Sequence, residues 1–138
     1  MKEISLKIHL FIPAVISFLV LGMIFLTRKR LFRIGTKKWF WISTTVFFAL
    51  YLFILCGAMY SGWQDQWNLN KYDLNQDGNF TGSEITPDME KAMKKLTNDT
   101  GLNLSFITGL ILSGLIALFV FGIGKISEFI KKRYTKKR

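Results

Sequence analysis

Three long apolar runs, none of which contains Asp, Glu, Lys or Arg, constrain this chain more than any other feature. They occupy residues 10–26, 39–60 and 104–124. A helix of roughly 20 mainly apolar residues crosses about 30 Å of hydrocarbon and satisfies its own backbone hydrogen bonds there. We therefore expect an all-α membrane protein with three transmembrane helices.

The basic residues outside these runs predict which segments face the cytoplasm. The linker of residues 27–38 has six bases and no acid, and the tail of residues 125–138 has seven bases and one acid. Residues 61–103 carry seven acids and four bases. By the positive-inside rule, the linker and the tail are cytoplasmic, whereas residues 1–9 and 61–103 are extracytoplasmic. This predicts a multi-pass membrane protein (in the inner membrane if bacterial) with its N-terminus out and its C-terminus in.

The excess of basic over acidic residues also indicates which partners to expect, and the residue types present bear on enzymatic activity. The net charge of +10 is concentrated beside the apolar runs, where Lys and Arg contact anionic lipid headgroups. We therefore expect membrane lipids as partners and no nucleic acid. The chain has one histidine, and its single cysteine, Cys56, falls inside the second run. Outside residues 73–84 the sequence offers no nucleophile or carboxylate pair that could be placed in a cleft, so we do not expect an enzyme.

Residues 73, 75, 77, 79, 81 and 84, in the acidic segment, all carry side-chain oxygen atoms. The stretch of residues 73–84 resembles the EF-hand family, whose twelve-residue loop binds Ca²⁺ through positions one, three, five, seven, nine and twelve, with glycine at position six. Gly78 occupies that sixth position. The resemblance implies a Ca²⁺ site formed by Asp73, Asn75, Asp77, Asn79, Thr81 and Glu84. It also implies an extracytoplasmic helix-loop-helix between the second and third spans.

The chain departs from the family in having a single loop. EF-hands usually pair through the eighth loop residue, which is Phe80 here. Three arrangements remain open: two copies of the chain pair, another chain covers Phe80, or the protein's own surface does.

A second departure is Pro87, which would break the helix that normally follows the loop. A new helix is expected to begin there with Thr86 as its cap and to run to about Thr97. It would bury Met89, Met93 and Leu96 on one face. These side chains either form an adaptable surface for a partner or pack against Trp63, Trp67, Leu69 or the bilayer surface.

Small residues recur every fourth position in the third run, at Ser105, Gly109, Ser113 and Ala117. The second run has a weaker version at Thr45, Ala49 and Gly57. Such faces allow close helix packing in lipid. A pore lining is the alternative interpretation, although no charged residue accompanies these positions.

The leading hypothesis is a calcium-binding integral membrane protein that acts as a small accessory or regulatory subunit of a larger membrane complex. Its partner would be another membrane protein or a second copy that pairs through the EF-hand. The alternative is an oligomeric calcium-modulated channel or transport component.

Overall fold

The computed structural model describes residues 2–32, 37–97 and 100–136. Over these residues the chain forms four α-helices and one short 3₁₀ helix, with no strand. The α-helices are α1 (Lys2–Leu31), α2 (Lys38–Asn70), α3 (Pro87–Thr97) and α4 (Thr100–Lys136), and the 3₁₀ helix is η2 (Gly82–Glu84). Residue 1, residues 33–36 of the predicted linker, residues 98–99 of the predicted outer segment and residues 137–138 of the predicted tail lie outside the described residues.

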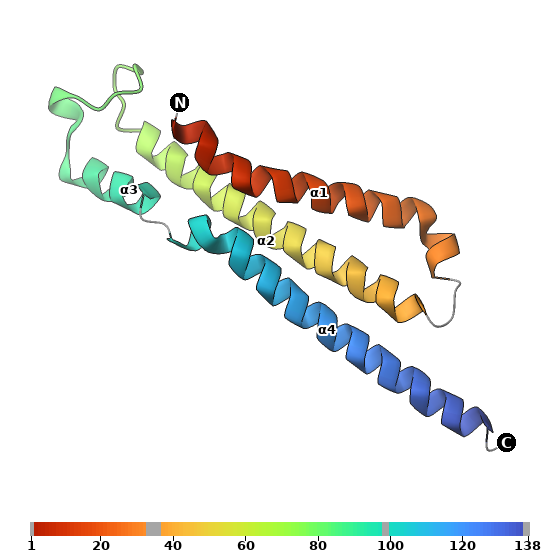
Figure 1. Cartoon of the computed structure of the whole chain (residues 1–138). Helices are drawn as coiled ribbons and strands as arrows, with labels where there is room; N and C mark the ends of the chain where they lie inside the picture. Colours follow the sequence, from red (N-terminus) through yellow and green to blue (C-terminus); the bar gives the residue numbers. More distant parts are fainter. Residues whose placement is uncertain (1, 33–36, 98–99, 137–138) are drawn as a thin grey trace.

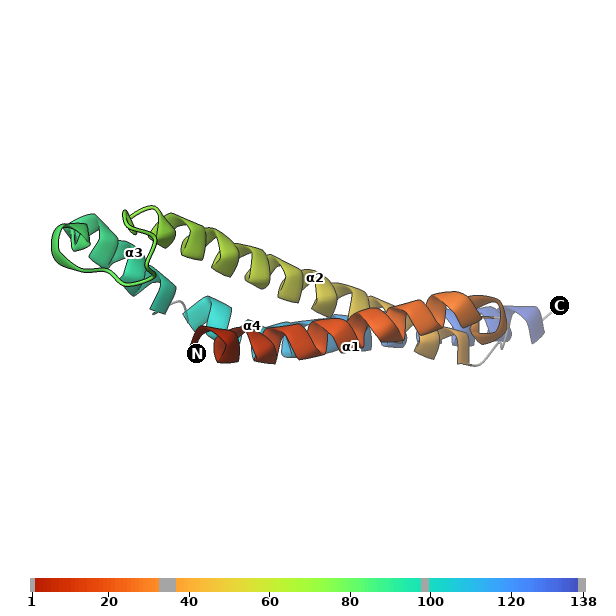
Figure 2. The ribbon, with the colours of Figure 1, turned by 90° about the horizontal axis from the view of Figure 1, so that it is seen from above.

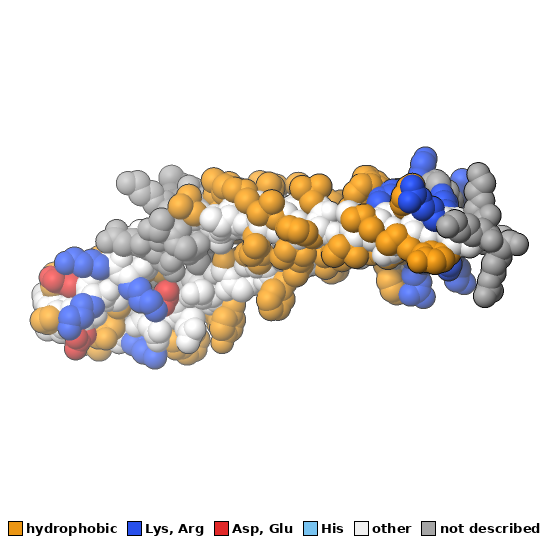
Figure 3. Space-filling model, turned by 90° about the horizontal axis from the view of Figure 1, so that it is seen from below, with side chains coloured by type: hydrophobic (Ala, Val, Ile, Leu, Met, Phe, Trp, Pro, Cys, Tyr) orange, Lys and Arg blue, Asp and Glu red, His pale blue; other side chains and the backbone are white. Residues whose placement is uncertain are grey.

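The three long helices lie side by side, with α2 between α1 and α4 (Figure 1). The 73–84 loop and α3 lie together at the end of the bundle where α2 finishes, and the last turn of α1 and the first turn of α2 lie at the other end (Figure 2). All three long helices are long and apolar enough to cross a membrane, as the sequence predicted. Apolar side chains cover the middle of the visible face, whereas charged ones gather toward its ends (Figure 3).

Each long helix continues past the end of its apolar run. The predicted spans end at residues 26, 60 and 124, but α1 reaches Leu31, α2 reaches Asn70 and α4 reaches Lys136. Loss of hydropathy marks where a helix leaves the hydrocarbon, not where its hydrogen bonding stops. At 1.5 Å per residue α2 is about 50 Å long, so it exceeds the roughly 30 Å hydrocarbon core.

The predicted small-residue face of α4 is confirmed as a packing surface. Ser105, Gly109, Ser113 and Ala117 are all buried. A Cβ atom added at Gly109 would lie 2.9 Å from Ile54 Cγ2 and 3.5 Å from Tyr51 Cδ2, both on α2. The Tyr51 hydroxyl also donates to the Phe106 carbonyl at 3.1 Å.

The corresponding prediction for α2 is wrong, because Ala49 and Gly57 are exposed and only Thr45 is half-buried. Instead, α2 presents Tyr51 and Leu55 to the centre of the bundle. The bulky side chains fill the space that the small residues of α4 leave open, so a second small face is not needed.

Helix α1 packs against α2 through one stripe of its surface. Leu10, Ala14, Ser17 and Ile24 are buried at helical spacing, and Leu10 and Ala14 join Tyr51 and Leu55 in the core. The Ser17 hydroxyl donates to the Pro13 carbonyl at 2.7 Å, within α1. From residue 10 onward, most other apolar side chains of α1 are exposed, as expected for a surface that faces lipid.

Candidate functional site

The candidate metal loop begins where α2 ends. The backbone N–H of Tyr72 donates to the Leu69 carbonyl, and that of Asp73 donates to the Asn70 carbonyl. These two bonds close the last turn of α2 and release the chain into the loop at Asp73. Asp73, the first predicted ligand, therefore lies three residues after the end of a long helix.

Within the loop, the short polar side chains bond to nearby backbone N–H groups. The Asp73 carboxylate accepts the Gly78 N–H at 3.0 Å, and Asp77 accepts the Asn79 N–H at 2.7 Å. Asn75 accepts the Asp77 N–H through Oδ1 at 3.0 Å and donates to the Asp77 carboxylate through Nδ2 at 2.9 Å. Asp and Asn favour tight turns through such local bonds. They fold residues 73–79 into one compact turn.

Gly78 adopts the backbone conformation that the sequence predicted for a sharp turn. Its φ is +77°, in the left-handed region that only glycine enters without strain. Gly82 has a φ of +58° and Gln76 a φ of +59°. Gln76 is the only non-glycine residue with positive φ among the described residues, so the turn holds it against its intrinsic preference.

Glu84 ties the end of the loop back to its beginning. Its Oε1 accepts the N–H groups of Leu74 at 2.8 Å and Asn75 at 3.2 Å, and its Oε2 accepts the Thr81 N–H at 3.1 Å. The side chain is buried, with only 5% of the residue exposed. These three N–H groups satisfy the acceptor oxygens of the buried carboxylate. The bonds link the end of the loop at Glu84 to its beginning at Leu74.

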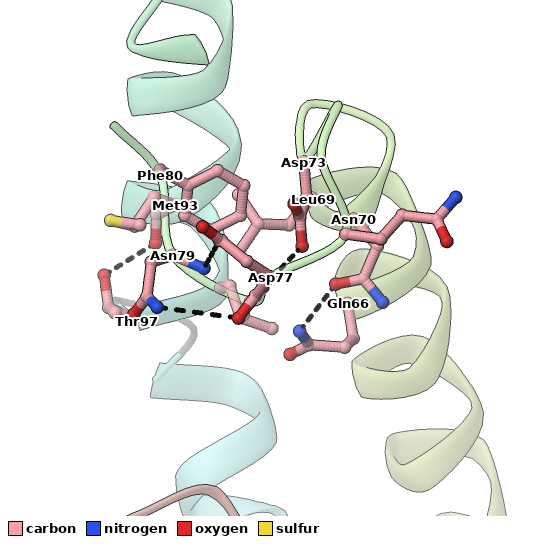
Figure 4. A pocket seen from close by; sticks show the side chains of 12 residues that line it. Gln66, Leu69, Asn70, Asp73, Asp77, Asn79, Phe80, Met93 and Thr97 are labelled. Carbon is pink, nitrogen blue, oxygen red and sulfur yellow. Dashed lines mark hydrogen bonds between the residues drawn. The ribbon is translucent and has the colours of Figure 1, made fainter. Parts of the chain in front are cut away.

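Three of the six predicted ligands border a common cavity of about 1020 Å³, open to solvent between α2, the loop and α3: Asp73, Asp77 and Asn79. Figure 4 shows Asn79 beside Phe80 and Met93, with Asp73 nearer the end of α2 and Asp77 between them. Asn75, Thr81 and Glu84 do not line it. No three His, Cys, Asp or Glu side chains converge as a metal cluster within the described part of the chain.

One buried side-chain oxygen of the loop has no hydrogen-bond partner. Asp73 Oδ1 is buried and makes no hydrogen bond, while the other oxygen of the same carboxylate binds the Gly78 N–H. A buried carboxylate oxygen is costly unless it is satisfied. A hard cation prefers such oxygens, so this atom is a candidate metal ligand.

Helix α3 begins as predicted. It starts at Pro87, and the Thr86 hydroxyl accepts the Met89 N–H at 3.2 Å as a cap. Met89 is buried and Leu96 half-buried, but Met93 is 37% exposed, so the expected burial of all three is only partly confirmed.

Trp63 and Trp67 of α2 are each about 60% exposed. Their rings meet edge to face, with centroids 6.1 Å apart.

Sequence reasoning missed the polar contact that joins α2 to α3. Lys95 Nζ of α3 lies 2.7 Å from Asp65 Oδ1 of α2, and the Asp65 side chain is only 7% exposed. The signal was the helical spacing of Gly62, Asp65 and Leu69, which continues the buried face of α2. It was overlooked because the predicted span stopped at Tyr60.

Comparison with protein-family models, curated proteins and solved structures gave no match to this chain. Its class therefore rests on its own fold and residues: an all-helical protein with three helices suited to crossing a membrane and a polar loop between the second and third of them.

Proposed function

We propose that this chain is a calcium-binding integral membrane protein with no catalytic role, which acts as a small accessory or regulatory subunit of a larger membrane complex. The 73–84 loop is a single EF-hand on the extracytoplasmic side. The observation that carries the proposal is the buried, unpartnered Asp73 Oδ1 in a loop already closed on itself by its own amides.

The ligand set follows from the sequence spacing. Asp73, Asn75, Asp77, Asn79, Thr81 and Glu84 would hold Ca²⁺, which supplies a positive charge for the crowded oxygens of the loop. Glu84 bonds to three backbone amides through its two oxygens. It must therefore exchange some of these bonds if it is to act as a ligand.

A regulatory role is supported by the position of the loop. The loop connects the end of α2 to α3, and α3 rests on α2 through Asp65 and Lys95. A change in the loop therefore alters how firmly α3 is held. The cavity beside it exposes Met93 and is also lined by Phe80 and Leu96, a mixed apolar and polar surface that a membrane-protein partner or a second copy would recognise.

Calcium titration of the full chain in detergent, by isothermal calorimetry, tests the metal site. We expect a dissociation constant of about 10⁻⁴ to 10⁻³ M, as for extracytoplasmic modules. Asp73→Asn and Glu84→Gln should each weaken binding at least tenfold. Asp88→Asn is the matched control, since Asp88 is an exposed carboxylate paired with Lys91 outside the loop. Absence of binding by the unaltered chain would reject the calcium proposal.

Orientation is tested separately in a Cys56→Ser background. Ser83→Cys, in the loop, should react with a membrane-impermeant maleimide in intact cells. Ser127→Cys, in the C-terminal part of α4, should react only after permeabilisation. Both serines are exposed, so a reversed pattern would overturn the assigned topology. Recovery of co-purifying membrane proteins with and without chelator then distinguishes regulation from a purely structural role of calcium.

The channel alternative receives no comparable support. Ser43 and Ser113, hydroxyls that a pore would require along its lining, are buried between helices. Ser43 donates to the Ala117 carbonyl of α4, and Ser113 donates to the Gly109 carbonyl of its own helix. Reconstituted single-channel recording separates the two proposals, because an accessory subunit alone should give no conductance.

A further inference from the structure

A groove between α1 and α2 has a cationic mouth and an apolar interior. It has a volume of about 450 Å³. Its α1 side runs from Phe18 to Arg28, Phe32 lines it just beyond, and Thr45 and Leu52 lie on the α2 side. Ten residues of helix span about 15 Å. That is about half of the roughly 30 Å hydrocarbon core, which is the depth of a single leaflet. The groove therefore has the length that one acyl chain occupies.

The interior of the groove leaves room beside Gly22. A Cβ atom added there would meet nothing within 4 Å. The other α1 residues along this stretch of the groove are large and apolar. The missing side chain thus opens a slot in an otherwise bulky surface, and a flexible hydrocarbon chain can fill it.

The mouth of the groove carries positive charge without a compensating acid. Arg28 lines it, with its guanidinium 4.6 Å from the centre of the Phe25 ring, and makes no ion pair among the described residues. Lys29, Arg30, Lys37 and Lys38 lie in the same basic segment, and no Asp or Glu occurs anywhere in residues 4–64. A guanidinium suits phosphate oxygens because its N–H groups form a fixed fork.

We propose that this groove is a binding site for one anionic glycerophospholipid, with an acyl chain lying past Gly22 and the phosphate at Arg28. Basic pockets between transmembrane helices bind anionic headgroups in this way. The charge of the mouth selects against a zwitterionic lipid, whose headgroup offers no net attraction. This site is independent of the calcium loop, which lies at the opposite end of the bundle (Figure 1).

Native mass spectrometry of the full chain in detergent tests the site, with dioleoyl phosphatidylglycerol and dioleoyl phosphatidylcholine added in parallel. The unaltered protein should retain one phosphatidylglycerol in preference to phosphatidylcholine. Arg28→Gln should reduce that retention about fivefold, since one basic residue near a membrane surface contributes about 1 kcal/mol. Lys29→Gln makes the same charge change outside the groove and should have a smaller effect.

A second pair of variants tests the acyl slot. Gly22→Phe fills the groove and should abolish the preference, whereas Gly57→Phe should not, because Gly57 is equally open but lies on exposed α2 surface away from the groove. Equal retention of both lipids by the unaltered protein would overturn the proposal. So would equal losses in Arg28→Gln and Lys29→Gln, which remain informative if Gly22→Phe does not fold.

Discussion

Asp65 of α2 and Lys95 of α3, thirty residues apart in the chain, meet at 2.7 Å. The carboxylate is nearly buried, with 7% of its side chain exposed, whereas the ammonium group is on a side chain that is 69% exposed. The contact holds a short helix, which would not persist alone, against the part of α2 that continues past its apolar run. The adjacent residues Gln66 and Leu96 line the cavity beside the candidate calcium loop.

Asp65→Asn should loosen α3 from α2 without unfolding the bundle. The exposed lysine limits the loss to about 1 kcal/mol or less, which corresponds to up to about fivefold faster amide exchange in residues 89–97. Hydrogen–deuterium exchange in detergent measures this. Lys91→Gln, which breaks the fully exposed pair with Asp88 inside α3, is the control. Equal acceleration in both variants would contradict a special role for Asp65.

The glycines of α4 predict a graded response to alanine. A Cβ atom at Gly124 would overlap the indole ring of Trp39, and one at Gly109 would press on Ile54 at 2.9 Å, whereas one at Gly122 would meet nothing within 4 Å. Overpacking typically costs about 1–3 kcal/mol. Thermal unfolding in detergent should therefore rank Gly124→Ala as the least stable and Gly109→Ala as intermediate. Gly122→Ala should be at least as stable as the unaltered chain, because alanine favours the helix more than glycine does. Any other order of the three variants would contradict the packing described for α2 and α4.

The Tyr51 hydroxyl makes a hydrogen bond between helices, so Tyr51→Phe isolates its contribution. The ring stays in place, and only the bond to the Phe106 carbonyl is lost. Such bonds in membrane proteins average about 0.6 kcal/mol, which unfolding by denaturing detergent can resolve. Tyr60→Phe is matched in chemistry, but Tyr60 is 62% exposed. Tyr60→Phe should leave the free energy of unfolding unchanged. A loss equal to that of Tyr51→Phe would contradict the contribution assigned to the Tyr51 hydrogen bond.

The tail of α4 has its own pH dependence. A hydrogen bond from Lys132 holds the pKa of Glu128 below its usual value of 4.5, and the charges of Lys132 and Lys125 act in the same direction. The ion pairs therefore stabilise this helix end above the ordinary carboxylate pKa and are lost as acidification protonates Glu128. Lys132→Gln should raise the pKa of Glu128, as measured by NMR titration in micelles. An unchanged pKa would show that Lys132 does not set it.

The spans and the start of α3 were predictable because their causes are local. Uncharged apolar runs can only be buried or embedded in lipid, and a threonine before a proline marks a helix start through its own hydroxyl. The small-residue face of α4 was also predictable, since Gly109 and Ser113 follow helical spacing. The matching surface of α2 was not predictable. Which α2 side chains fill the space beside the small residues of α4 depends on how two segments distant in the sequence align.

The candidate site was predictable only in part. The left-handed backbone of Gly78 follows from its place in the calcium-loop pattern. The bonds from Glu84 to the amides of Leu74 and Asn75 join opposite ends of the loop and arise only when it closes. Asp65 was missed because hydropathy falls after Tyr60 although the helix continues.

Two of the three residues of the loop with left-handed backbone give opposite predictions. Gly78 has a φ of +77° and Gln76 a φ of +59°, and a residue with a side chain there is strained by roughly 1–2 kcal/mol. Gly78→Ala should therefore destabilise the loop and weaken calcium binding about tenfold, whereas Gln76→Gly should relieve strain and leave binding equal or tighter. Amide exchange of residues 74–84 without calcium reports the backbone effect independently of the metal. If both variants weaken binding while loop exchange is unchanged in each, backbone strain is not what shapes this loop.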